Sequence, residues 1–262
     1  MKIAFVQFLC SFGEVEKNLL RARELILSAD ADLYVLPELF NTGYVFLDRA
    51  EAASFAEEIP DGKTARFLAK LAVEKKCYIV AGLAEKSDGR VYNSSLLTGP
   101  QGFITTYRKI HLFSEEKVWF DLGNEPFKVV DIGLAKIGLM ICFDWIFPES
   151  MRSLALQGAD IVCHPSNLVL PYCPDAMVTR CIENRVFAVT ANRIGYDQRN
   201  GKKLSFIGMS QITGPLGEVL CRASKDREEI KVVEIDVQQA RNKNITEKNH
   251  VLQDRRPEMY SL

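Results

Sequence analysis

The sequence predicts an α/β protein, a four-layer α-β-β-α sandwich with a pseudo-twofold internal repeat. Runs rich in Ile, Val, Phe and Leu alternate with amphipathic segments along the chain, which is the pattern of strands and helices packed in layers. Three segments of the first half are echoed in the same order in the second half. No linker, low-complexity segment or charge block divides the 262 residues, so we expect a single domain over residues 1–262.

The expected elements follow from hydrophobic periodicity and from turn residues at their ends. The expected strands are 2–8, 32–36, 77–83, 91–98, 102–108, 127–131, 136–142, 160–163, 186–191, 206–213, 218–222 and 229–235. The expected helices are 14–29, 64–76, 148–157 and 174–185. In the first helix Leu19, Leu20, Ala22, Ile26 and Leu27 form a stripe at helical spacing, which favours packing on a sheet.

The internal echo predicts how the layers are arranged. The paired segments are KIAFVQF (2–8) with KIGLMIC (136–142), ADLYVLPE (31–38) with ADIVCHPS (159–166), and SLLTGPQG (95–102) with SQITGPLG (210–217). Each half would contain a β-α-β unit followed by a further helix and a hairpin, and two such sheets would pack face to face with helices outside. Ligands bind beyond the carboxyl ends of strands in α/β sheets. Glu38 and Cys142 both follow such ends.

Composition narrows the classes of partner. Lys plus Arg number 33 and Asp plus Glu 34, so the net charge is −1 and no strong field attracts nucleic acid or anionic lipid. Seven cysteines are spread singly, without a CxxC or His-rich pattern, which argues against disulfides and zinc and favours a reducing cytoplasm.

The start MKIAFVQFLCSF contains Gln7 and is followed by Glu14, so we interpret it as a buried strand rather than a signal peptide. No apolar run approaches the roughly 18 residues that a bilayer requires.

Cys142 stands in surroundings that set it apart from the other cysteines. The apolar run 136–142 ends at this residue, and Phe143, Asp144 and Trp145 break the alternation. Pro148 then marks the first turn of a helix. A strand-to-helix turn exposes its side chain, and a nearby helix N-terminus lowers the pKa of a thiol. Buried free cysteines are usually inert, so an inert thiol and a nucleophile are both open here, and the turn strengthens the case for a nucleophile.

Two further residues with ionisable side chains, Glu38 and Lys109, stand at or just after the ends of expected strands. Glu38 stands between Pro37 and Leu39 in DLYVLPELF. A glutamate there is either a loop carboxylate that points to water or, because its apolar neighbours exclude water, a group suited to general acid–base chemistry. Lys109 ends an expected strand and leads into an aromatic loop, in ITTYRKIHLFSEEKVWF. A lysine there is either a solvated strand-end charge or a fixed cation for a developing oxyanion.

Together these motifs resemble the nitrilase superfamily of carbon–nitrogen hydrolases over essentially the whole chain. The matching motifs are PEL (37–39), YRK-x-HLF (107–113), C-x-D-x-x-FPE (142–149), HPSN (164–167), ENR (183–185) followed by AN-R (191–193), and DRRPEMY (254–260). The resemblance implies a Glu-Lys-Cys triad of Glu38, Lys109 and Cys142, acting through a Cys thioester without metal or organic cofactor. It implies an oxyanion held by Lys109 and the backbone N–H of Phe143.

Members of this superfamily often carry a second glutamate after the lysine. Glu115 and Glu116 both qualify, and we select Glu116 because it is nearer the aromatic loop. We expect Asp144 to support the turn that follows Cys142 rather than to take part in the chemistry. The expected substrate-binding residues are Tyr44, Phe113, Trp119, Phe143, Trp145 and Asn167. Their aromatic character favours a small aliphatic or aromatic amide or nitrile over a dicarboxylate monoamide or a carbamoyl-polyamine.

The expected activity is that of an amidase that releases ammonia and a carboxylic acid. Hydrolysis of nitriles, hydrolysis of N-carbamoyl amides and acyl transfer to an amine are alternatives on the same fold. A papain-like thiol hydrolase would need His111 or His164 as base, and a non-enzymatic binding module would need none of these groups. The resemblance also implies a homodimer or larger homo-oligomer, with helix 174–185 and the C-terminal tail (about 245–262) in contact with the partner copy.

Overall fold

A computed structural model of the chain describes residues 1–260. The strands are β1 (Lys2–Gln7), β2 (Leu33–Val35), β3 (Tyr78–Ser87), β4 (Arg90–Gly99), β5 (Gly102–Arg108), β6 (Val129–Asp131), β7 (Lys136–Leu139), β8 (Ile161–Pro165), β9 (Phe187–Ala191), β10 (Tyr196–Arg199), β11 (Lys202–Ser205), β12 (Gln211–Thr213), β13 (Val219–Arg222), β14 (Glu229–Glu234), β15 (Asn244–Thr246) and β16 (Asn249–His250). The helices are α1 (Val15–Leu27), α2 (Arg49–Phe55), α3 (Lys63–Lys75), α4 (Glu116–Trp119), α5 (Pro148–Leu156), α6 (Cys173–Asn184) and α7 (Gln238–Arg241), with 3-10 turns η1 (Cys142–Ile146) and η2 (Pro257–Met259).

Two six-stranded mixed sheets form the centre of the molecule, with the orders β14-β1-β2-β3-β4-β5 and β13-β12-β9-β8-β7-β6. In the first, β1, β2 and β3 run parallel, and β4 and β5 follow antiparallel. In the second, β7, β8 and β9 run parallel, and β12 and β13 follow antiparallel. The two sheets therefore repeat one topology, which confirms the α/β fold class and the internal repeat.

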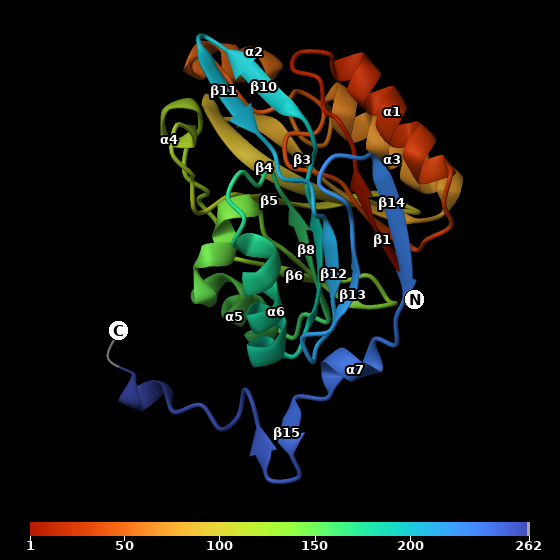
Figure 1. Cartoon of the computed structure of the whole chain (residues 1–262), viewed down its shortest axis with the longest axis vertical. Coiled ribbons are helices and arrows are strands. Elements are labelled where there is room, and N and C mark those ends of the chain that lie inside the picture. The colour runs from red at the N-terminus through yellow and green to blue at the C-terminus, as the bar shows by residue number, and fades with distance from the viewer. Residues whose placement is uncertain (261–262) are drawn as a thin grey trace.

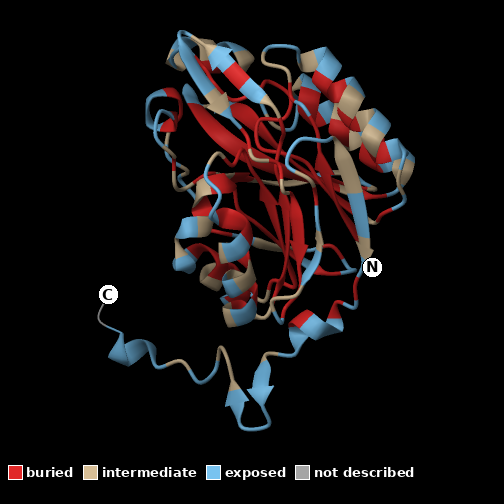
Figure 2. Ribbon diagram, in the orientation of Figure 1, coloured by how far each residue is buried: buried red, intermediate tan, exposed pale blue. Residues whose placement is uncertain are grey.

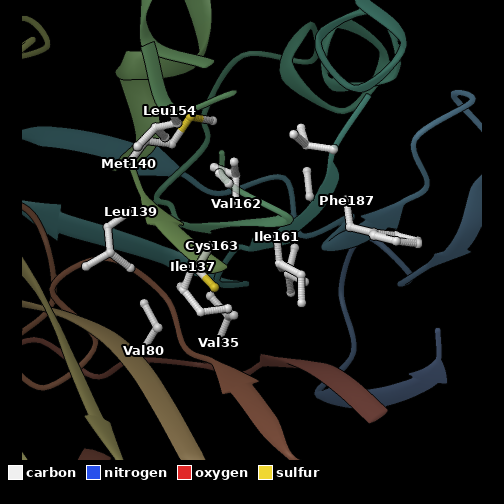
Figure 3. Close-up of a cluster of buried hydrophobic side chains, with 14 of the residues drawn as sticks. Val35, Val80, Ile137, Leu139, Met140, Leu154, Ile161, Val162, Cys163 and Phe187 are labelled. Carbon is white, nitrogen blue, oxygen red and sulfur yellow. The ribbon is translucent and has the colours of Figure 1, made fainter. Parts of the chain in front are cut away.

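The two sheets face each other across an apolar core. Side chains alternate along β8, so that Ile161 and Cys163 share one side of the strand and Val162 lies on the other (Figure 3). Val35 and Val80 of the first sheet approach Ile137 and Leu139 of the second in the same cluster. This two-sided burial explains the near-continuous apolar runs of the parallel strands.

Helices cover the outer faces of both sheets (Figure 1). The apolar stripe of α1, with Leu19, Ala22 and Ile26, packs with residues of α3 in a cluster under the first sheet. Met151 and Leu154 of α5 join the core of the second sheet, as do Met177 and Cys181 of α6. The buried residues lie between these helices and exposed residues lie on their far sides (Figure 2), as the sandwich prediction requires.

Several expected boundaries are wrong. The expected strand 136–142 ends at Leu139, although the backbone stays extended as far as Ile141 and turns at Cys142. Of 206–213 only Gln211–Thr213 is a strand. The β10–β11 hairpin was not predicted, nor were α2, α4 and α7. The hairpin strands are mostly exposed and polar, so they lack the apolar alternation on which the prediction relied.

The C-terminal tail leaves the body of the molecule after α7 (Figures 1 and 2). Strands β15 and β16 pair only with each other, and Ile245, Met259 and Tyr260 are exposed. The contact between copies that we expect through this tail and α6 stays a prediction, and residues 261–262 lie outside the described residues. Over residues 1–260, none of the helices combines the length and apolar character that crossing a membrane demands.

We expect Ile161→Ala to lower the free energy of unfolding by about 2–5 kcal/mol, because it opens a cavity in the core between the sheets. Ile161 is fully buried. Urea unfolding followed by circular dichroism measures the change. Ile245→Ala removes the same atoms from an exposed tail position and serves as the control. An equal loss in both variants would contradict this description of the core.

Candidate active site

Glu38 lies just beyond β2 and is completely buried. Its Oε1 accepts hydrogen bonds from Asn93 Nδ2 and from Lys109 Nζ, each at 2.7 Å. Its Oε2 is buried without a hydrogen-bond partner among the described residues. A buried carboxylate oxygen normally has a partner, so this free oxygen is available to a proton or a ligand.

A glycine on the neighbouring strand allows Glu38 to occupy this position. A Cβ atom on Gly82 of β3 would lie 2.5 Å from the Glu38 Cα. The same strand holds the loop, because the Gly82 N–H donates to the Pro37 carbonyl and the Phe40 N–H donates to the Gly82 carbonyl, both at 3.1 Å. The sequence therefore places glycine where the backbone of the Glu38 loop crosses β3.

Lys109 follows β5 and is likewise buried. Its Nζ donates to Glu38 Oε1 at 2.7 Å and to both carboxylate oxygens of Glu116, at 2.7 and 2.8 Å. The backbone is fixed as well, since the Lys109 N–H donates to the Asn93 carbonyl and the Lys109 carbonyl accepts from the Gly123 N–H. The ammonium thus makes three contacts with carboxylate oxygens, which supply the opposite charge that a buried cation requires.

Glu116 is the first residue of α4 and completes the ion cluster. It is buried, and it accepts hydrogen bonds from the Tyr44 hydroxyl and from Lys109. Burial, together with the negative charge of Glu38, raises the pKa of Glu116 to about 7 although Lys109 acts in the opposite direction. Glu115, the alternative from sequence, is exposed and lies 3.3 Å from Lys202.

The ammonium of Lys109 stays charged in this environment. Burial favours its neutral form, but the carboxylates of Glu116 and Glu38 outweigh that effect and raise the Lys109 pKa above its usual value. One cation thus faces two carboxylates, and burial raises the Glu116 pKa above its ordinary value. Such groups are suited to proton transfer.

Cys142 occupies a sharp turn after β7. Its φ angle is +39°, a conformation that L-residues with a side chain rarely adopt and that often marks a functional turn. The Asp144 carboxylate stabilises the turn through contacts with the Ile141 N–H at 2.8 Å, the Tyr107 hydroxyl at 2.7 Å and His111, whose Nδ1 lies at 2.7 Å and whose backbone N–H donates at 3.3 Å. Asp144 therefore holds the turn, as its sequence position indicated.

The surroundings of the Cys142 thiol link it to Glu38 and Lys109. Burial, followed by the charge of Glu38, raises the Cys142 pKa well above its usual value, while Lys109 and the backbone amide of Asn167 act to lower it. Asn167 Nδ2 also donates to the Glu38 carbonyl at 2.9 Å. The thiol is therefore protonated at neutral pH and needs a base to become a nucleophile.

A papain-like mechanism needs a histidine within hydrogen-bonding distance of the Cys142 sulfur, and the histidines near Cys142 have other partners. His164 Nε2 lies 2.8 Å from the Cys142 carbonyl oxygen and its Nδ1 lies 3.0 Å from the Thr190 hydroxyl, so Nε2 carries the proton. Burial lowers the His164 pKa to about 4, and His111 contacts Asp144. Within residues 1–260 no histidine nitrogen forms a hydrogen bond with the Cys142 sulfur, which disfavours the papain-like alternative.

The expected binding residues divide between two cavities. A cavity of about 160 Å³ beside Cys142 is lined by Phe113, Phe143, Trp145, Ile146, Asn167, Leu168, Val169, Leu170 and Tyr172. Tyr44 and Trp119 instead line a separate cavity of about 440 Å³, which shares Phe113 with the first. Four of the six expected binding residues, Phe113, Phe143, Trp145 and Asn167, therefore surround Cys142.

Sequence reasoning missed two residues that position the site, Asn93 and Gly82. Asn93 could have been found from the sequence, because a polar run at 93–95 interrupts an otherwise apolar strand. Buried polar side chains need hydrogen-bond partners. Gly82 gave no such signal in the sequence, because its close approach to the backbone of Glu38 arises from tertiary structure alone.

Lys109→Met should destabilise the protein by about 3–5 kcal/mol at pH 8, because it leaves two carboxylates buried without their cation. Lys109 lowers the Glu116 pKa, so its loss raises that pKa further above the unfolded value. A raised carboxyl pKa favours the folded state at low pH, and that advantage disappears as the pH rises. The deficit should therefore be much smaller at pH 5.

Urea unfolding at the two pH values measures this difference. Lys117→Met, at an exposed position of the same short helix, is the matched control and should show no pH-dependent deficit. A deficit in Lys109→Met that is equal at pH 5 and pH 8 would contradict the charge cluster.

Comparison with known proteins agrees with this geometry. Residues 2–244 match the family model described as carbon-nitrogen hydrolase. A nitrilase from Pyrococcus abyssi is 49% identical over 263 residues, covering 99% of each chain, and an (R)-stereoselective amidase from Pseudomonas sp is 37% identical over 91% of this chain and 86% of its own.

A solved structure from Nesterenkonia sp. AN1 gives the same fold. It is a variant of an amidase in which acrylamide has added to the active-site cysteine, and it is 26% identical with a TM-score of 0.81, covering 98% of this chain and 97% of that chain. The chain therefore belongs to the carbon–nitrogen hydrolase family and is a hydrolase of the nitrilase superfamily.

Proposed function

We propose that the protein is an amidase that hydrolyses small uncharged primary amides through a thioester on Cys142. The observation that supports this most strongly is the free Oε2 of Glu38. The other carboxylate oxygen, Glu38 Oε1, is held by Asn93 and Lys109. Among the charged neighbours of Cys142, Glu38 has the largest effect on the pKa of the thiol. One carboxylate oxygen is thus fixed while the other can accept a proton, as a general base requires.

Acylation begins when Glu38 takes the thiol proton and the Cys142 sulfur attacks the amide carbon. The Lys109 ammonium and the Phe143 N–H stabilise the oxyanion that forms, and one such donor is typically worth ~10²–10³ in rate. Glu38 then donates its proton to the amide nitrogen as the C–N bond breaks. Ammonia departs and a thioester remains on Cys142.

Deacylation repeats the proton transfers with water. Glu38 takes a proton from a water molecule while the oxygen of that water attacks the thioester carbon. Glu38 then returns the proton to the Cys142 sulfur as the C–S bond breaks. The carboxylic acid leaves and the free thiol is restored. Glu116 holds the Lys109 ammonium through two hydrogen bonds, so it acts as a positioning residue.

The cavity beside Cys142 determines the substrate class. Its lining residues are apolar or aromatic except for Asn167, Cys142 and the Tyr172 hydroxyl, and none carries a charge. A volume of about 160 Å³ fits a compact acyl group. A carboxylate or ammonium on that group would lose its hydration without a partner, which costs several kcal/mol. We therefore favour amides such as isobutyramide or benzamide over succinamate.

Nitrile hydrolysis is the second candidate. A relative that is 49% identical is named a nitrilase, and the same thiol can attack a nitrile carbon. A panel of matched amides and nitriles, scored by ammonia release, separates the two activities. Faster turnover of the amide in each pair supports the proposal, and faster turnover of the nitrile overturns it in favour of a nitrilase.

Cys142→Ala should abolish ammonia release, because it removes the sulfur that attacks the amide carbon and forms the thioester. Glu38→Gln should remove acylation as well, since acid–base catalysis by one group contributes ~10²–10⁴ in rate. Intact-protein mass spectrometry detects the acyl adduct on Cys142. Cys221→Ala, at a half-buried cysteine of β13, is the control and should turn over normally. The proposal is falsified if Cys142→Ala keeps substantial turnover.

In Tyr44→Phe, the pH at which kcat/KM rises should be higher than in the native protein by about half to one pH unit. The Tyr44 hydroxyl bond lowers the Glu116 pKa from the value that burial alone would give. Without it, ionised Glu116 forms only at higher pH, and Lys109 loses its anchor below that pH. A pH–rate profile on one amide measures the shift.

Tyr34→Phe is the matched control, because the Tyr34 hydroxyl bonds the Ala29 carbonyl and the Ala31 N–H beneath the other face of the first sheet. Its profile should follow that of the native protein. Identical profiles for all three proteins would exclude the positioning role of Tyr44.

A further inference from the structure

We propose that Asp197 is a positioning residue of the active site. It fixes the backbone of Tyr44, whose hydroxyl in turn bonds Glu116 beside Lys109. Asp197 belongs to the β10–β11 hairpin, which lies beside α2 and α4 at one end of the molecule (Figure 1). Among the described residues of β10 and β11, Asp197 alone is buried. Because a carboxylate is rarely buried unless it is paired, its partners explain why the hairpin directs it inward.

The Asp197 carboxylate holds the segment that precedes α2. Its Oδ2 accepts hydrogen bonds from the Tyr44 N–H at 2.9 Å and from the Val45 N–H at 3.2 Å. These residues lie 153 and 152 positions from Asp197 in the sequence, so the contact joins the hairpin to a distant part of the chain. Hydrogen bonds to an ionised acceptor are stronger than those between neutral groups, so the Tyr44 backbone is held firmly.

Arg193 holds the Asp197 carboxylate in this orientation. The arginine is completely buried. Its Nη2 donates to Asp197 Oδ1 at 2.9 Å and its Nη1 donates to Oδ2 at 3.1 Å, which is the two-point geometry that arginine forms with carboxylates. Nη2 also donates to the Cys10 carbonyl. The AN-R motif (191–193) thus supplies the cation that allows Asp197 to be buried.

Aromatic contacts also fix the Tyr44 ring. Phe206 and Trp119 meet it edge to face, with centroid distances of 6.0 and 5.9 Å. The Arg193 guanidinium lies over the Phe206 ring, 4.1 Å from its centroid. Such pairs favour one arrangement of the rings. Since both its backbone and its ring are held, Tyr44 presents its hydroxyl at one place, where it bonds the Glu116 carboxylate.

Glu116 passes this position on to the catalytic ammonium. It accepts hydrogen bonds from Lys109 Nζ at 2.7 and 2.8 Å and from the Phe113 N–H at 3.3 Å. Burial is the main influence on the Glu116 pKa and raises it, Glu38 acts in the same direction, and the bonds from Lys109 and Tyr44 lower it. A displaced Tyr44 would therefore leave Lys109 less firmly anchored. Misplacement of a catalytic group by about 1 Å can cost ~10² in rate.

This inference rests on the proposed function, because the ammonium that Asp197 helps to position is the one that holds the oxyanion. The reactivity of Cys142 tests it without turnover. Burial and the Glu38 charge raise the Cys142 pKa, and Lys109 lowers it, so a misplaced ammonium stabilises the thiolate less. A carboxylate that only anchored the hairpin would affect stability and leave this reactivity unchanged.

Iodoacetamide labelling of Cys142 at a series of pH values, followed by peptide mass spectrometry, measures how readily the thiolate forms. In Asp197→Asn, we expect the labelling profile to lie about half to one pH unit above that of the native protein. For an amide substrate, kcat should fall ~10-fold or more. KM should change by less than about twofold, because Tyr44 does not line the cavity beside Cys142.

Asp160→Asn is the matched control. Asp160 is buried to the same extent as Asp197 and accepts hydrogen bonds from the Lys136 N–H at 2.9 Å and from Arg241 Nη2 at 3.1 Å. It precedes β8, at the end of that strand opposite the active site. Asp160→Asn should therefore lower stability, as any loss of a buried ion pair does, and keep the native labelling profile.

The double variant Tyr44→Phe/Asp197→Asn tests whether Asp197 acts through Tyr44. If it does, the two effects are not additive, and the profile of the double variant should lie no higher than that of the more strongly shifted single variant. A native profile in Asp197→Asn, an equal shift in Asp160→Asn, or additive shifts in the double variant would each overturn the proposal.

A second variant, Arg193→Met/Asp197→Asn, serves if Asp197→Asn alone does not fold. It removes both charges together, so that neither is left buried and unpaired. It should show the same upward shift of the labelling profile, and a native profile in this variant would overturn the proposal as well.

The two proposals fail in different ways. A native chain that releases no ammonia from the amide panel would overturn the proposed amidase, and the labelling profiles would still decide the role of Asp197. Amide turnover by the native chain, together with a native labelling profile in Asp197→Asn, would overturn this inference alone.

Discussion

The buried ion cluster around Lys109 is the interaction on which the active site depends. A lysine with no exposed side-chain surface is tolerable only when every ammonium hydrogen has a partner, since desolvation costs several kcal/mol per ion. Glu38 and Glu116 supply those partners from segments that lie 71 and 7 residues from Lys109. The fold must therefore bring the ends of β2 and β5 and the start of α4 together before the cation can be buried at all.

The internal repeat explains how the cluster meets the thiol. Glu38 follows a parallel strand of the first sheet and Cys142 follows a parallel strand of the second, and the apolar core holds the two sheets face to face. Asn167, which follows β8, joins them, because its side chain donates to the Glu38 carbonyl while its backbone amide favours the Cys142 thiolate. Each half of the repeat thus contributes one reacting group, and the rigid interface between the sheets fixes their separation.

The same reasoning shows what could be predicted from sequence. Glu38, Lys109 and Cys142 each stand at or just after an expected strand end, but it was the resemblance to the nitrilase superfamily that joined them in one triad. The echo between halves predicted the paired sheets. The positive φ of Cys142 was not predictable from the sequence. The β10–β11 hairpin escaped detection because its side chains are mainly exposed. The division of the aromatic residues between two cavities depends on packing, which spacing along the chain does not encode.

The most direct test of the convergence of these groups is a crystal structure of the protein with isobutyraldehyde, an aldehyde that a thiol converts to a tetrahedral adduct resembling the transition state. We expect a covalent bond from the Cys142 sulfur to the aldehyde carbon, with the adduct oxygen within hydrogen-bonding distance of Lys109 Nζ and Glu38 Oε2 beside the new centre. An adduct oxygen directed away from Lys109, or an unmodified thiol under saturating aldehyde, would contradict the proposed mechanism.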